Sequence, residues 1–156
     1  MDLPEPVGMP VKAPYEFASG FVYQFTAENN LTAFEACYNE DAASFVYVKQ
    51  GLANLVEGNT SEAIADFAMF GAALPDDVAT CKLAKIDLVA VEQWATIFEP
   101  ANRTALIADV TQHYMFHHKA IKADIANLKG DWALGEYYAA GGAAAKLAYD
   151  AVGPVE

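Results

Sequence analysis

The chain has 156 residues, which corresponds to one domain, and its net charge is −12 with only nine lysines and arginines. Nucleic acids and anionic membrane surfaces select clustered basic residues, so neither is an expected partner. No apolar run reaches the roughly 18 residues that a membrane span requires. Because 54% of the residues are hydrophobic, we expect part of the surface to face another subunit or an apolar ligand.

Residues 1–14 are predicted to form an extended arm, because they contain four prolines. This stretch is acidic and has no apolar core, so it is neither a signal peptide nor a transit peptide. The protein is therefore either cytosolic or a mature chain whose signal has been removed. Residues 15–156 are predicted to form a single helical domain.

Helical patterns begin directly after the arm. Phe17, Phe21 and Phe25 recur every four residues and predict the buried face of a first helix. The capping box of Thr32 and Glu35 predicts a short helix that ends at residue 37. Two further helices are expected over residues 41–56, with Gly58 as the stop, and over residues 60–73, with Pro75 as the stop.

Three longer segments complete the predicted fold. Asp76 or Asp77 can cap a segment that continues to Phe98, and Asn102 can cap a segment that ends at Gly130. Asp131 can then cap a final helix from residue 132 to about residue 151. Strand signals are almost absent. The expected fold class is all-α, a compact bundle of five to seven helices.

The last predicted helix contains a run of small residues, A-A-G-G-A-A-A at positions 139–145. Each glycine in the middle of a helix costs about 1 kcal/mol relative to alanine. Close packing against another helix, in the same chain or in a neighbouring subunit, is the expected compensation. We assign a self-association surface to Tyr137, Tyr138, Gly141 and Gly142.

Three of the seven asparagines begin an N-x-[ST] sequence, the acceptor for an N-linked glycan: Asn30, Asn59 and Asn102. All three also lie where a helix is expected to begin. Asparagine is a preferred N-cap residue, so helix capping is the alternative explanation. We predict glycosylation at one or more of these sites if the protein is secreted.

The two cysteines are Cys37 and Cys81. In a secreted domain an even number of cysteines indicates a disulfide, and two buried thiols are the alternative. Their spacing excludes a zinc knuckle and a C-x-x-C redox pair.

All three histidines lie in H-Y-M-F-H-H, residues 113–118. His113 and His117 share a helix face with Asp109, so these three residues are weak candidates for a metal site. The sequence lacks H-E-x-x-H, G-x-S-x-G and a glycine-rich phosphate loop. We therefore expect no metal, no cofactor and no enzymatic activity.

Several short motifs together resemble a diffuse group of small, secreted, two-cysteine helical proteins of ciliates and other protists. The motifs are F-x-x-G-F at 17–21, the cysteines at 37 and 81, an aliphatic-x-x-D-I stretch at 121–125, G-D at 130–131, the aromatic pair at 137–138, A-G at 140–141 and G-P at 153–154. The resemblance implies secretion, a Cys37–Cys81 bridge and a helical bundle, and it implies no activity.

Taken together, these patterns favour a secreted structural glycoprotein that associates with copies of itself into an extracellular oligomer, filament or coat. The expected partners are the chain itself and N-linked glycans. The alternative is a secreted carrier that holds a lipid or pigment inside the bundle, among Phe, Tyr and Trp side chains.

Overall fold

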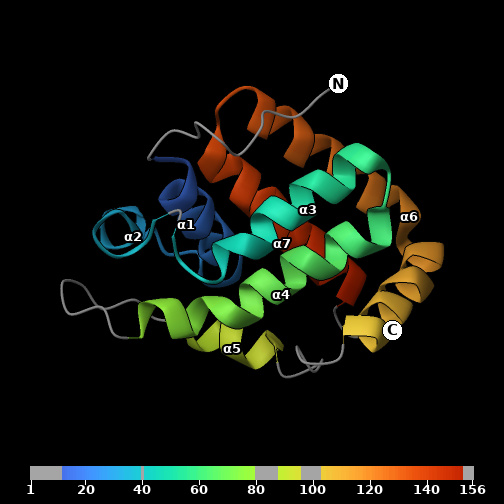
Figure 1. Ribbon diagram of the computed structural model, residues 1–156, viewed down its shortest axis with the longest axis horizontal. Helices are drawn as coiled ribbons and strands as arrows, with labels where there is room; N and C mark the ends of the chain where they lie inside the picture. Colours follow the sequence, from blue (N-terminus) through green and yellow to red (C-terminus); the bar gives the residue numbers. More distant parts are fainter. Residues whose placement is uncertain (1–11, 40, 80–87, 96–102, 153–156) are drawn as a thin grey trace.

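The computed structural model describes residues 12–39, 41–79, 88–95 and 103–152. These residues form seven helices and no strand, which confirms the all-α prediction (Figure 1). The helices are α1 (Lys12–Thr26), α2 (Leu31–Cys37), α3 (Phe45–Glu57), α4 (Thr60–Val78), α5 (Val89–Ala95), α6 (Arg103–Ala133) and α7 (Tyr137–Val152).

Helix α1 begins at Lys12, so the prediction that residues 12–14 belong to an extended arm is wrong. Pro14 occupies the first turn, where its missing N–H is not needed for a helical hydrogen bond. Ala13 and Pro14 are both buried, and this burial stabilises the early start. The rest of the predicted arm, residues 1–11, lies outside the described residues.

The sequence predicted that α3 stops at Gly58 and that α4 stops at Pro75, and the first prediction is right and the second wrong. Helix α3 ends as predicted at Gly58, whose φ of 82° is left-handed and suits glycine. Helix α4 continues through Pro75 to Val78. Leu74 and Val78 are buried, and their burial offsets the hydrogen bond that a proline removes near a helix end.

Helix α2 begins at Leu31, so Thr32 is its second residue and not the predicted cap.

Asp77, predicted to begin a new helix, lies in the last turn of α4 and accepts a hydrogen bond from the Ser44 N–H at 2.7 Å. The sequence predicted that a helix begins at Asp76 or Asp77 and continues to Phe98. Of this segment after α4, the structure describes the short helix α5, while residues 80–87 and 96–102 lie outside the described residues.

Gly130 does not end α6, contrary to the prediction. The helix continues to Ala133, and Gly135, with φ of 77°, turns the chain instead. The Gly135 N–H bonds the Trp132 carbonyl at 3.0 Å, and the Glu136 N–H bonds the Asp131 carbonyl at 2.9 Å. Burial of Trp132 favours an extra helical turn here. Asp131 is therefore inside α6 and does not cap α7.

The core is built from aromatic side chains of α1, α4 and α6. Phe17 meets Phe70 edge-on with ring centroids 5.6 Å apart, and it meets Trp132 in the same way at 5.9 Å. Phe21 packs on Phe70 at 5.0 Å. Phe17 and Phe21 are fully buried and Phe25 is partly buried, which confirms the predicted face of the first helix.

Helix α7 crosses α1 at very close range. A methyl group at Gly20 would overlap the carbonyl oxygen of Tyr138, and one at Gly141 would overlap that of Phe17. The two helices can approach this closely only because both positions lack a side chain. This contact fixes α7 between α1 and α6.

Candidate functional site

The small residues of α7 serve a contact within the chain. Gly141 lies against Phe17 of α1, and Tyr137 is 8% exposed and packs on Trp132 with ring centroids 4.9 Å apart. Neither residue is free to contact a second copy, so the prediction that Tyr137 and Gly141 belong to a self-association surface is wrong. Tyr138 and Gly142 are only half-buried and line a pocket.

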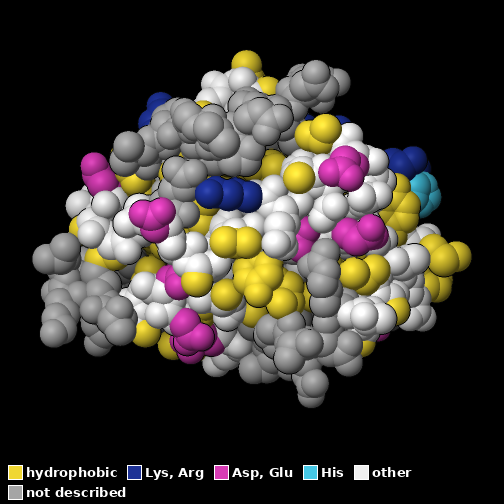
Figure 2. All heavy atoms as spheres, viewed as in Figure 1, with side chains coloured by type: hydrophobic (Ala, Val, Ile, Leu, Met, Phe, Trp, Pro, Cys, Tyr) yellow, Lys and Arg dark blue, Asp and Glu magenta, His cyan; other side chains and the backbone are white. Residues whose placement is uncertain are grey.

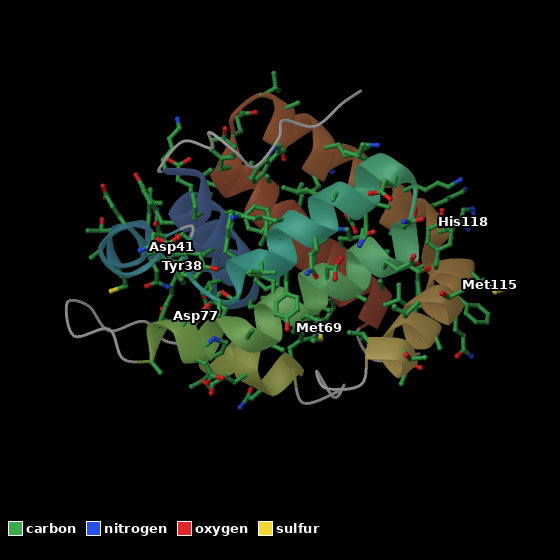
Figure 3. The ribbon with its side chains drawn as sticks, in the orientation of Figure 1. Tyr38, Asp41, Met69, Asp77, Met115 and His118 are labelled. Atoms are coloured by element: carbon green, nitrogen blue, oxygen red, sulfur yellow. The ribbon has the colours of Figure 1, made fainter. Side chains whose placement is uncertain are left out.

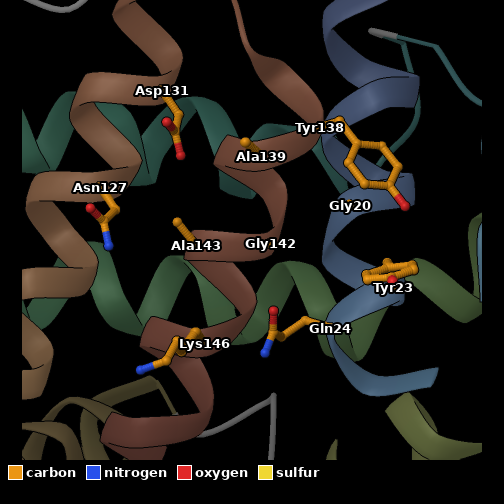
Figure 4. A pocket seen from close by; sticks show the side chains of 10 residues that line it. All are labelled: Gly20, Tyr23, Gln24, Asn127, Asp131, Tyr138, Ala139, Gly142, Ala143 and Lys146. Atoms are coloured by element: carbon orange, nitrogen blue, oxygen red, sulfur yellow. The ribbon is translucent and has the colours of Figure 1, made fainter. Parts of the chain in front are cut away.

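This pocket, about 310 Å³ in volume, lies over α7 between α1 and α6 (Figure 4). Its floor consists of Ala139, Gly142 and Ala143 of α7 with Gly20 of α1. These residues carry at most a methyl group, so the floor is apolar and no long side chain extends from it into the pocket. The pocket therefore follows directly from the close approach of α1 and α7.

The walls of the pocket are polar and aromatic. Helix α1 supplies Tyr23 and Gln24, and α6 supplies Asn127 and Asp131. The ring of Tyr23 lies 6.0 Å from that of Tyr138. Burial and the nearby Glu136 carboxylate raise the pKa of Asp131. A neighbouring cation would relieve this unfavourable charge.

Lys146 lies at one end of the pocket (Figure 4). Two carboxylates hold its ammonium group. Its Nζ is 3.3 Å from Asp124 Oδ1 of α6 and 3.3 Å from Asp150 Oδ2 of α7. Because this ammonium group is already paired with two carboxylates, it adds little free positive charge to the pocket.

Asp124 is a buried acid, with 2% of its surface exposed and no hydrogen bond to Oδ2. Burial and the adjacent Asp150 raise the pKa of Asp124 to about 7, although Lys146 acts in the opposite direction. Asp124 therefore changes its protonation state near neutral pH. The cluster couples α6 to α7 beside the pocket.

A second surface feature is a bend in α6. His117 has non-helical backbone angles, φ −124° and ψ 26°. Before the bend, the Thr111 hydroxyl bonds the Ser61 hydroxyl of α4 at 2.9 Å. After it, Asp124 pairs with α7. The bend allows the two halves of α6 to pack against different helices.

Exposed apolar and basic side chains gather at this bend. Met115 is 74% exposed and Phe116 is 71% exposed. His117, His118 and Lys119 follow them and are all exposed. We name residues 115–119 the elbow. Figure 3 shows Met115 and His118 at the end of the molecule opposite Tyr38, Asp41 and Asp77.

The elbow differs in charge from most of the protein. Figure 2 shows acidic side chains and some basic ones spread over one face, while a histidine and a basic side chain lie next to each other at the right-hand edge, over α6. With a net charge of −12 for the whole chain, a basic and apolar surface of this kind stands out.

The metal-site candidates are arranged for hydrogen bonding. His113 Nδ1 donates to the backbone carbonyl of Asp109 at 2.8 Å, and the ring stacks on His117 with centroids 6.4 Å apart. The Asp109 carboxylate is thus not the partner. In the part of the chain that the structure describes, no three His, Cys, Asp or Glu side chains form a group that could hold a metal ion.

The structure places two of the three sequons. Asn30 and Asn59 occupy N-cap positions of α2 and α4, but neither side chain makes a cap hydrogen bond. Asn30 Nδ2 is buried, and Asn59 Nδ2 donates to Asn54 Oδ1 at 3.4 Å. A glycan on Asn30 would require this amide to turn outward. Asn102 lies outside the described residues.

Cys37, the last residue of α2, is disulfide-bonded. Cys81, the only other cysteine in the sequence, lies outside the described residues. The pairing of the two cysteines therefore stays a prediction.

Sequence reasoning missed both the pocket and the elbow. The elbow left a signal in the spacing of α6. Its buried positions are Leu106, Val110, His113, Ile121, Asp124, Leu128 and Trp132. Met115 and Phe116 fall outside this register, so two large apolar side chains had no predicted place in the core. The pocket left no such signal, because its residues come from three separate helices.

Comparisons of the chain with protein-family models, with curated proteins and with solved structures found no match. The resemblance to secreted protist proteins stays a prediction. Among the described residues, no helix is long and apolar enough to cross a membrane.

Proposed function

We propose that this chain is a non-enzymatic structural protein of the extracellular space that associates with copies of itself through the elbow. The observation that carries the proposal is the pair Met115 and Phe116, exposed by 74% and 71% on adjacent positions. Adjacent exposed apolar side chains of this size favour burial against another molecule. Flanking basic side chains are typical of an interface that must also select its partner.

Charge favours a second copy as this partner. The chain carries a net charge of −12, so most faces of two copies repel each other. The elbow, with His117, His118 and Lys119, can approach an acidic face of a neighbour without that repulsion. Self-association through the elbow is therefore favoured over association through other faces.

The disulfide of Cys37 supports the extracellular location. Disulfides persist in oxidising compartments and are rare in the cytosol. Secretion also brings the sequons into contact with the glycosylation machinery.

A non-reducing intact mass of protein from a secreting eukaryotic source tests this location. We expect a mass above the 16.8 kDa of the bare chain, which falls on enzymatic deglycosylation. After deglycosylation, two protons should be missing for the disulfide. A bare and fully reduced mass would contradict secretion and leave Asn30, Asn59 and Asn102 unmodified.

The alternative function, a carrier with an apolar ligand inside the bundle, has less support. Where a ligand would have to lie between α1, α4 and α6, the rings of Phe17, Phe21, Phe70 and Trp132 contact one another. The pocket over α7 is open to the surface and lies outside this core. We therefore do not place an apolar cargo in the described core.

Replacing both apolar elbow residues tests the proposed function. The double variant Met115→Gln/Phe116→Gln keeps two good helix formers and removes the apolar surface. We expect its self-association, measured by sedimentation velocity, to weaken by about tenfold or more, as for central interface residues. The monomer fold, followed by far-ultraviolet circular dichroism, should not change.

The matched control is Val46→Gln/Val56→Gln on α3. These side chains are 47% and 49% exposed, so this variant also removes two exposed apolar side chains and leaves the elbow residues unchanged. It should associate like the wild type. Equal association of the elbow variant and the wild type would rule out the elbow as the contact surface.

A further inference from the structure

We propose that the elbow of one copy docks into the pocket over α7 of the next copy. This inference rests on the proposed self-association and names the surface that receives the elbow. Two different surfaces then meet at each contact. Such a head-to-tail arrangement repeats along a filament or closes into a ring.

The elbow cannot fill the pocket of its own chain. Phe116 and Asn127, the pocket residue of α6 that is nearer to it in sequence, both belong to α6. At about 1.5 Å per residue, the helix rise separates them by roughly 16 Å. Only the pocket of another copy is then available to this elbow.

The pocket suits the apolar part of the elbow. Its volume of about 310 Å³ and its floor of Gly20, Ala139, Gly142 and Ala143 leave room for a large side chain. Phe116 can lie on this floor beside the rings of Tyr23 and Tyr138, since aromatic pairs favour tilted and edge-on contacts. Met115 can contact a ring edge through its sulfur.

The pocket also suits the charge of the elbow. Asp131 faces the pocket with Glu136 close by, while the positive charge of Lys146 is offset by Asp150 and by the ionised fraction of Asp124. The remaining charge at the pocket is negative. Lys119 of a neighbouring elbow would supply the cation that this pocket lacks.

A mixing experiment tests the docking. One variant, Met115→Gln/Phe116→Gln, lacks the elbow and keeps the pocket. The other, Ala139→Leu/Gly142→Leu, fills the pocket and keeps the elbow. A side chain can be placed at Gly142, where a Cβ would meet its nearest neighbour, the Gly20 carbonyl oxygen, at 3.6 Å. Both variants retain good helix formers.

We expect each variant alone to sediment as a monomer. Their equimolar mixture should form a complex of twice the chain mass of 16.8 kDa, because one intact elbow meets one intact pocket. The complex should stop at two copies, whereas the wild type continues to larger species. Formation of the complex also shows that both variants are folded.

Three outcomes would overturn the inference, and they separate it from the proposed function. If the pocket-filled variant assembles like the wild type, the elbow docks elsewhere, and self-association itself stands. If the mixture stays monomeric while the wild type assembles, the pocket receives something else, such as a small organic cation. If the wild type is itself monomeric at all concentrations, the proposed function fails first.

Discussion

Alanine at Gly20 or Gly141 is expected to destabilise the protein by more than about 3 kcal/mol, beyond the usual cost of overpacking. In both cases the new methyl group would overlap a backbone carbonyl oxygen, of Tyr138 or of Phe17. A carbonyl in a helix cannot move aside as a flexible side chain can, so α1 and α7 must separate. Chemical denaturation of each variant measures the loss in the free energy of unfolding.

The control for this prediction is Gly130→Ala in α6. A methyl group at Gly130 meets nothing within 4 Å, so only helix propensity changes. We expect a gain of up to about 1 kcal/mol. If Gly20→Ala and Gly141→Ala were as stable as this control, the close contact between α1 and α7 would be wrong.

The second large effect is a fall in stability as the pH rises from about 4.5 to about 7. The pKa of Asp124 is about 7 in the folded protein and about 4 in an unfolded chain. Between these values the folded state binds more protons than the unfolded state. The free energy of unfolding then decreases with pH, by at most about 1.4 kcal/mol per unit from this group. Urea denaturation at several pH values measures the slope.

Asp124→Asn isolates this contribution. Asparagine keeps the size of the side chain and stays neutral, so the part of the slope that comes from Asp124 should disappear. The remaining slope would include Asp131, whose pKa is also raised. An unchanged slope in Asp124→Asn would contradict the prediction, because it would mean that the pKa of Asp124 is the same in the folded protein and in the unfolded chain.

The number and kind of the helices could be predicted from the sequence because local periodicity encodes them. Phe17, Phe21 and Phe25 identify the buried face of α1 without reference to any other helix. Helix ends were harder. Pro75 and Gly130 are stop signals by propensity, yet burial of Val78 and Trp132 extends both helices past them. Tertiary packing overrides local preference at these points.

The candidate surfaces were less predictable because they depend on contacts between distant residues. The run of small residues in α7 correctly indicated a close helix contact, but the sequence does not say that the partner is α1. Asp124 and Lys146 are 22 positions apart, and nothing in their spacing brings them together. The pocket needs the bundle to be assembled before its walls exist.

Self-association is the central claim, and sedimentation velocity of the wild-type protein over a wide concentration range tests it most directly. We predict a weight-average mass that rises with concentration above the 16.8 kDa of one chain and passes beyond two copies. A mass equal to that of one chain at every concentration would contradict the claim, because the elbow would then not bind a second copy.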